Sequence, residues 1–255
     1  MIFAPFNSSA VGVYDPVTRS YSDGDTHGET GSNLFTGAVL APTGTVVLVP
    51  GNSETIAEYD ATTDVLTNPA AHGETLAAFQ GGALAQTGEV ILAPRASSNV
   101  GIYDPVAGSY RSGPSISVSS SDAFWGAALA PTGEIVFAPN ESPNVGLYDP
   151  STDSYTTGPS HGEGSNAFAG ASLSPTGKVV FAPNDASNVG IYDPVAGSYE
   201  SGPTTDTSSF AGATLTQTGE VVFAPFFSSN VGSVAEFASL SVPRGTAVHP
   251  LVNSS

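Results

Sequence analysis

The chain has 255 residues, of which only 11% are charged, and 23 acidic against 5 basic residues give a formal net charge of −18. This balance excludes binding to nucleic-acid backbones and disfavours anionic membrane surfaces, because both carry the same sign of charge. The absence of cysteine excludes disulfide bonds and thiolate chemistry. Glycine and proline contribute 29 and 20 residues, an excess that predicts many turns and few long helices.

The sequence gives no sign of a membrane-spanning or targeting segment. No apolar stretch approaches the ~20 residues of a helical span, and Met1–Pro5 lacks the basic region and apolar core of a signal peptide. We therefore expect no membrane insertion. The compartment stays unassigned, although an acidic, lysine-poor surface favours a saline or extracellular setting, where salt screens the repulsion between carboxylates.

Three sequence markers recur along the chain with one period of 42 to 45 residues. Tripeptides equal or similar to Phe-Ala-Pro end at Pro5, Pro50, Pro94, Pro139, Pro183 and Pro225. A Tyr-Asp pair begins at Tyr14, Tyr59, Tyr103, Tyr148 and Tyr192, and a turn glycine recurs at Gly44, Gly88, Gly133, Gly177 and Gly219. Internal repeats of this length indicate stacked or ring-like repeat architectures.

Each repeat contains four short runs rich in β-branched and aromatic residues, separated by turn residues. In the repeat at 168–203, Pro175-Thr176-Gly177 fits the turn of a hairpin, and Asp193-Pro194 opens a second turn. Four antiparallel strands repeated around an axis form a β-propeller. We therefore predict an all-β fold, a β-propeller of four-stranded antiparallel blades, with small Gly and Ala residues in the strands nearest the axis.

In chain order, the first repeat is incomplete and the last one degenerates. Residues 1–30 are expected to supply the second, third and fourth strands of a blade. Four complete blades are expected at about 31–70, 71–115, 116–160 and 161–204. The last repeat should contain strands near 208–216, 220–226 and 229–236, with a further strand at 237–242.

Residues 1–255 are interpreted as one propeller domain, whose closing segment at 227–255 is degenerate. Six blades are favoured, with the ring closed by tail strands that pair with the N-terminal segment. In the alternative ring of five blades, the strand at 208–216 completes the first blade. Either ring needs closure, because an unpaired strand edge promotes aggregation.

The string Val-Gly-Ile-Tyr-Asp-Pro-Val-Ala-Gly-Ser-Tyr at 189–199 resembles the third and fourth strands of Kelch and YVTN-type propeller repeats. The preceding Leu-Ser-Pro-Thr-Gly-Lys-Val-Val-Phe-Ala-Pro at 173–183 is similar to the Pro-x-Gly-hydrophobic hairpin of the YVTN group. The resemblance covers about residues 1–236. It implies a scaffold that binds a protein or another ligand and indicates little about chemistry.

The candidate site residues belong to loops that such a blade places on one face of the ring. The tripeptide His-Gly-Glu occurs in three blade-to-blade loops and contributes His27, Glu29, His72, Glu74, His161 and Glu163. Imidazole and carboxylate groups around one axis can bind a divalent metal, whose identity is left open, or hydrogen-bond a sugar. In the alternative interpretation, each motif only fastens its own loop to the neighbouring blade.

The residues after each second strand vary, whereas the residues on either side of them are constant. This is the pattern of a fold whose variable loop residues determine which ligand binds. These pairs are Phe6-Asn7, Gly51-Asn52, Arg95-Ala96, Asn140-Glu141, Asn184-Asp185 and Phe226-Phe227. Asn140 and Asn184 are predicted to contact a ligand.

We expect a non-enzymatic binding module that recognises a glycan or a protein through this face and needs no cofactor beyond the metal considered above. The alternatives are a hydrolase or lyase with an axial His/Glu site, and a structural repeat module of a surface assembly.

Overall fold

The computed structural model describes residues 1–118, 120–205 and 209–235, which form 22 strands in six antiparallel sheets. The first sheet contains β1 (Ile2–Phe3), β2 (Ala10–Asp15) and β3 (Ser20–Thr26). The second contains β4 (Phe35–Leu40), β5 (Val46–Pro50), β6 (Thr55–Asp60) and β7 (Val65–Ala71). The third contains β8 (Phe79–Leu84), β9 (Val90–Pro94), β10 (Asn99–Asp104) and β11 (Ser109–Ser115).

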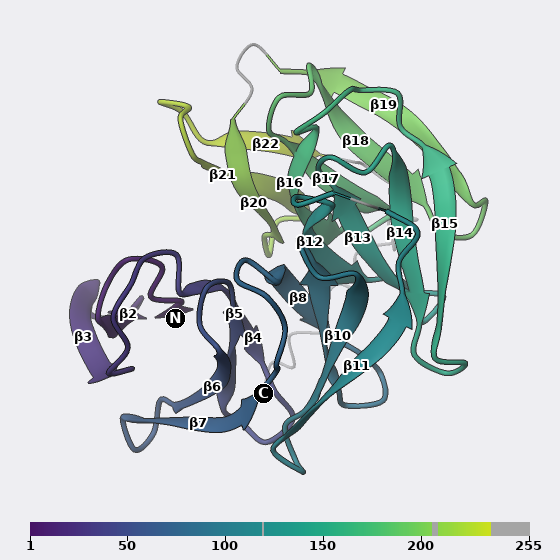
Figure 1. Ribbon diagram of the computed structural model, residues 1–255. Coiled ribbons are helices and arrows are strands. Elements are labelled where there is room, and N and C mark those ends of the chain that lie inside the picture. Colours follow the sequence, from purple (N-terminus) through teal and green to yellow (C-terminus); the bar gives the residue numbers. More distant parts are fainter. Residues whose placement is uncertain (119, 206–208, 236–255) are drawn as a thin grey trace, which may run out of the picture.

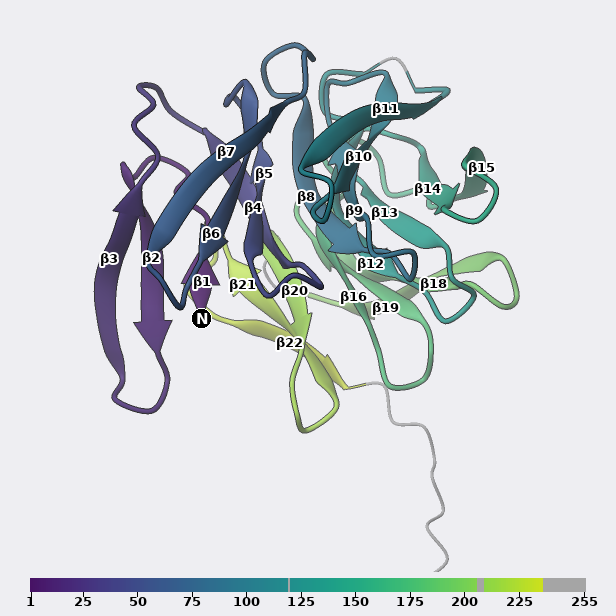
Figure 2. The same ribbon diagram turned by 90° about the horizontal axis from the view of Figure 1, so that it is seen from below.

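The remaining sheets repeat the same order of strands. The fourth contains β12 (Phe124–Leu129), β13 (Ile135–Pro139), β14 (Asn144–Asp149) and β15 (Ser154–Ser160). The fifth contains β16 (Phe168–Leu173), β17 (Val179–Pro183), β18 (Asn188–Asp193) and β19 (Ser198–Thr204), and the sixth contains β20 (Phe210–Leu215), β21 (Glu220–Pro225) and β22 (Gly232–Ala235). Figures 1 and 2 show the sheets as blades around a common axis.

The turns predicted from the sequence close the hairpins. In the first turn of the second sheet, the amide of Gly44 donates to the carbonyl of Ala41 at 3.0 Å. In the turn between the third and fourth strands, the carboxylate of the aspartate that follows each tyrosine accepts from the backbone amide two residues later. Asp15, for example, accepts from the amide of Val17 at 2.8 Å. This backbone hydrogen bond lowers the pKa of Asp15. The repeated aspartates therefore shape turns.

The second strand of each complete blade lies in the core. All five residues of β5, β9, β13 and β17 are buried, and the blades pack on one another through apolar clusters, such as the one that joins Val47 of the second sheet to Phe79 of the third. The first strand lines the axis, where glycines let neighbouring strands approach. A Cβ on Gly126 would lie 2.8 Å from the Cα of Gly170 in the next blade.

The prediction of an all-β propeller is confirmed, and the ring has six blades. The five-bladed alternative is wrong, because β20 pairs with β21 to form a sheet of its own. The strand predicted at 237–242 and the proposed closure by tail strands lie outside the described residues. Within those residues, no helix has the length and hydrophobicity needed to cross a membrane.

Among the described residues, the first sheet lacks the first strand of a blade and the sixth sheet lacks the fourth. In the first sheet the described residues contain no strand on the axial side of β1, and Phe3 is consequently 46% exposed, whereas the corresponding Leu48 of β5 is fully buried. In the sixth sheet no described strand follows β22. The first and sixth sheets therefore border a seam, where the described residues show no packing of first strands like that of β16 against β20. Figure 1 shows β2 and β3 of the first sheet apart from the β20–β22 sheet.

Candidate ligand-binding site

A cavity of about 540 Å³ lies on the axis, at the end of the ring where first strands begin and second strands end. We call it the axial cavity. Two positions per repeat supply most of its side chains. The second residue of the first strand contributes Thr36, Gln80, Trp125, Ala169 and Ala211, and the residue after the proline of the second strand contributes Phe6, Arg95, Asn184 and Phe226. The rest of the lining is mostly glycine and alanine of the first strands, with Ala4, Asn33, Phe35 and Phe210. The cavity lies at the end of the ring that carries the loop face predicted to bind a ligand.

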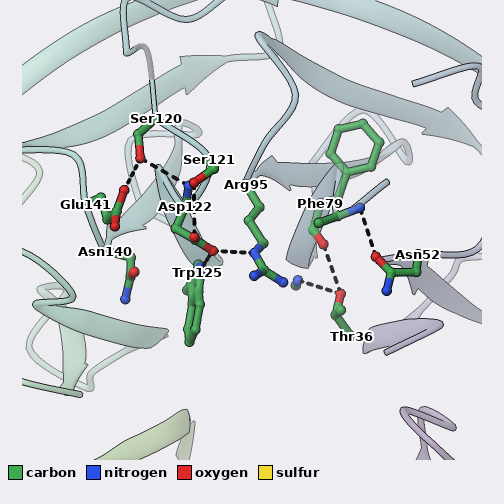
Figure 3. A network of polar contacts seen from close by, with 12 residues as sticks. Thr36, Asn52, Phe79, Arg95, Ser120, Ser121, Asp122, Trp125, Asn140 and Glu141 are labelled. Carbon is green, nitrogen blue, oxygen red and sulfur yellow. Dashed lines mark hydrogen bonds and ion pairs between the residues drawn. The ribbon is translucent and has the colours of Figure 1, made fainter. Parts of the chain in front are cut away.

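Arg95 and Trp125 line the polar side of the axial cavity, and Asp122, which is not a lining residue, binds both of them. The Nε of Arg95 donates to Oδ1 of Asp122 at 2.5 Å, and Nε1 of Trp125 donates to the same oxygen at 3.3 Å. The guanidinium carbon of Arg95 lies 5.2 Å from the centroid of the Trp125 ring, within the range of a cation–π contact. Asp122 thus holds both side chains in place. Figure 3 shows them with Thr36 on the opposite side of the guanidinium group.

Polar atoms at the axial cavity lack protein partners. Among the described residues, the two terminal nitrogens of Arg95, Nη1 and Nη2, make no hydrogen bond, because only Nε is engaged. The side-chain oxygen of Gln80 is buried and accepts no hydrogen bond from the part of the chain that the structure describes. A buried polar atom without a partner costs free energy, which a ligand group can recover. The axial cavity is therefore prepared for a polar ligand.

The His-Gly-Glu motifs form clasps between blades. In each copy the histidine Nε2 donates to a serine carbonyl of its own blade, at 2.8 Å for His27, 2.7 Å for His72 and 2.8 Å for His161. Their Nδ1 atoms accept from the amides of Glu29, Glu74 and Glu163, each at 3.1 Å. Both ring nitrogens are therefore hydrogen-bonded, Nδ1 within the motif and Nε2 to the loop between the second and third strands of the same blade.

The glutamates of the motifs reach into the next blade. Glu74 accepts from the hydroxyl of Tyr110 at 3.0 Å, and Glu163 accepts from that of Ser201 at 2.6 Å. Glu29 accepts from Ser53 at 2.8 Å. Burial, together with the carboxylate of Glu74, raises the pKa of Tyr110. These contacts correspond to the alternative interpretation, in which each motif fastens its own loop to the neighbouring blade.

Of the eight predicted ligand-binding residues, only Asn184 lines the axial cavity. Asn140 is fully buried and donates to the carbonyl of Phe168 at 3.0 Å, while its own carbonyl oxygen has no partner. The histidines and glutamates of the motifs are not among the lining residues. Within the described parts of the chain, no three His, Asp or Glu side chains are grouped so that they could hold a metal ion.

Sequence reasoning missed Gln80 and Trp125. Their signal is variation inside a constant pattern: the second position of the first strand reads Thr, Gln, Trp, Ala and Ala, while the preceding residue is always Phe. The constant phenylalanine locates the strand, and the variable residue after it marks the site.

Comparisons with known proteins show the fold alone. No protein-family model and no curated protein matches the chain. Among solved structures, virginiamycin B lyase from Staphylococcus aureus is similar at 12% identity and a TM-score of 0.76, covering 91% of this chain and 75% of that one. A catalytically inactive variant of that lyase, solved with quinupristin, is similar at 11% identity and a TM-score of 0.76, with 91% and 79% covered. A streptogramin B lyase is similar at 11% identity and a TM-score of 0.74, with 92% and 79% covered.

Proposed function

We propose that the protein is a non-enzymatic binding module that recognises a glycan in the axial cavity. The volume of about 540 Å³ falls within the usual range for small-molecule sites. An aromatic ring, unpaired hydrogen-bond donors on Arg95 and an unpaired acceptor on Gln80 are groups that a sugar can use. Sugar hydroxyls both donate and accept, so they can satisfy the two kinds of atom at once.

The observation that carries this proposal is the composition of the cavity lining. The described side chains that line it include no carboxylate, imidazole, lysine or tyrosine. General acid–base catalysis needs such a group within hydrogen-bond reach of the reacting atom. The lining therefore favours binding over chemistry.

A lyase is the second candidate, because the similar structures are lyases. In one of them, a variant with a histidine replaced by alanine is described as catalytically inactive. Here the described histidines are tied into the clasps, with both ring nitrogens hydrogen-bonded. This difference favours the binding module.

The test uses Trp125, which is the only tryptophan of the chain and lines the axial cavity. Its fluorescence should change in a saturable way when a panel of monosaccharides and disaccharides is titrated in. The Gln80→Ala variant should weaken the response, whereas Gln86→Ala, at a turn outside the cavity, should preserve it. Turnover of virginiamycin B by the protein would instead favour the lyase, and a flat response to every sugar would contradict glycan binding.

A further inference from the structure

The axial cavity is polar on one side and apolar on the other. The second, third and fourth sheets contribute polar or hydrogen-bonding side chains, namely Thr36, Gln80, Arg95 and Trp125. The fifth, sixth and first sheets contribute Ala169, Ala211, Phe226, Ala4 and Phe6, and the polar residues on this side are Asn184 and Asn33, the latter from the loop between the first and second sheets. A ligand that fills this space therefore needs two ends of different character.

The polar end is built to receive a carboxylate. Asp122 occupies Nε of Arg95, and the Trp125 ring lies beside the guanidinium plane, so the direction of the fork is fixed. Nη1 and Nη2 remain without partners among the described residues. Two N–H groups of a guanidinium match the two oxygens of a carboxylate, and such paired bonds are among the strongest hydrogen bonds in proteins.

A carboxylate alone does not complete the polar end. The buried side-chain oxygen of Gln80 needs a donor, which a carboxylate cannot supply. A hydroxyl group can. A ligand that carries a carboxylate together with hydroxyl groups is a sugar acid.

The apolar end is formed by two aromatic side chains from opposite sides of the seam. Phe6 follows the first sheet's β1 and is 41% exposed, and Phe226 follows β21 of the sixth sheet and is 53% exposed. Both line the axial cavity. Removing their exposed faces from water would favour an apolar group at this end of the ligand.

We propose that the axial cavity binds a uronic acid glycoside with an apolar aglycone. The sugar carboxylate pairs with Arg95, a sugar hydroxyl donates to Gln80, and the aglycone lies against Phe6 and Phe226. This inference rests on the proposed glycan-binding function and names the class of glycan.

The ligand test uses three matched probes: phenyl β-glucuronide, methyl β-glucuronide and phenyl β-glucoside. Titration calorimetry should give the tightest binding for phenyl β-glucuronide. The glucoside lacks the carboxylate and should bind about tenfold to a hundredfold more weakly, since a charge-assisted hydrogen-bonded pair is lost. The methyl glucuronide lacks the aromatic aglycone and should bind about tenfold more weakly.

Matched variants assign each end of the ligand to its residue. Arg95→Gln should reduce the affinity for phenyl β-glucuronide to that for the glucoside, whereas Arg111→Gln should not, because Arg111 pairs with Asp153 and Glu89 away from the cavity. Phe226→Ser should abolish the preference for the phenyl over the methyl glucuronide. Its neighbour Phe227 is 81% exposed and does not line the cavity, so Phe227→Ser should retain that preference.

The outcomes separate this inference from the function on which it rests. Equal affinity for the glucuronide and the glucoside, or no binding of either glucuronide while neutral sugars of the panel bind, would overturn the sugar-acid assignment and leave glycan binding in place. Failure of all three probes and of the whole panel would overturn both. Circular dichroism of every variant verifies that the fold is retained.

Discussion

At the scale of single residues, the His-Gly-Glu clasps show how one sequence motif serves two blades. His72 is 7% exposed and fastens the loop to its own blade through the carbonyl of Ser53. Glu74 then binds Tyr110 and Ser97 of the next blade. Because the imidazole donates through Nε2 and accepts through Nδ1, it satisfies one backbone group in the β5–β6 loop and one in the β7–β8 loop.

We expect His72→Ala to destabilise the fold by about 3 kcal/mol. The substitution leaves the Ser53 carbonyl and the Glu74 amide without their partners and removes a ring that packs against Phe79. Urea unfolding followed by circular dichroism measures the loss. The control is Glu54→Ala at an exposed position, which should change stability by less than about 0.5 kcal/mol. Equal stability of the two variants would refute the clasp.

At the scale of elements, the first strands pack more closely than ordinary side chains permit. Gly126 has a φ of +119°, and a Cβ placed there would meet the backbone of β16. Gly44, in the β4–β5 turn, also has a positive φ, of +88°, but a Cβ there would meet nothing within 4 Å. Both glycines are needed for a positive φ, but only Gly126 is also needed for close packing, so comparing the two positions distinguishes the two effects.

Gly126→Ala should cost distinctly more stability than Gly44→Ala. The turn variant bears only the strain of a positive φ, about 1 kcal/mol. The axial variant bears that strain and a backbone clash, so we expect about 3 kcal/mol or more. Thermal and urea unfolding of both variants measures the difference. If the two losses were the same, the axial spacing would not depend on glycine.

Most of the elements could be predicted from the sequence because each blade repeats its own turn chemistry. The proline at 183 and the tyrosine at 192 mark the ends of two strands in one repeat, and their equivalents mark the other blades. The ligand site could not be predicted in this way. Arg95, Asp122 and Trp125 come from a loop after β9, a blade-to-blade loop and β12, and no local pattern links them. Their contact depends on the curvature of the ring.

The histidine motifs illustrate the same limit. The sequence placed His27, His72 and His161 in the correct loops, but repetition alone does not reveal whether a side chain faces the axis or its neighbouring blade. Hydrogen bonds to Ser8, Ser53 and Ser142 decide the direction, and the acceptors are backbone carbonyls, which any residue at those positions would offer.

At the scale of the whole molecule, tyrosines link the blades through carboxylates. Tyr103 donates to Glu58 of the preceding blade. Tyr59 and Tyr148 donate to aspartates of their own blades, Asp64 at 2.8 Å and Asp153 at 2.9 Å, and these two carboxylates also accept from the amide of Asp25 and from Arg111 of the preceding blades. Burial and the hydrogen bond to Asp64 raise the pKa of Tyr59 to about 12. Burial raises the pKa of Tyr155 to about 12 as well. The ring therefore contains several phenols that resist ionisation.

The fold should consequently lose stability in alkali. A phenol whose pKa is higher in the folded than in the unfolded chain contributes its full stability below the unfolded value of about 10. That contribution declines as the pH rises from there through about 12, the value for Tyr59 and Tyr155. Tyrosinate absorbance and circular dichroism, recorded together against pH, should show ionisation of these groups coinciding with unfolding. Full ionisation near pH 10 of a still folded protein would contradict the buried tyrosine–carboxylate pairs.

A ligand in the axial cavity would also connect the two sheets that border the seam. Phe6 and Phe226 belong to the first and sixth sheets, which among the described residues lack the first-strand packing that joins the other neighbouring blades from the second sheet to the sixth. A small molecule in contact with the phenyl groups of both residues would connect the first sheet to the sixth. By thermodynamic linkage, a ligand at 100 times its Kd adds about 2.7 kcal/mol to the free energy of unfolding. The melting temperature should therefore rise when the cavity is occupied.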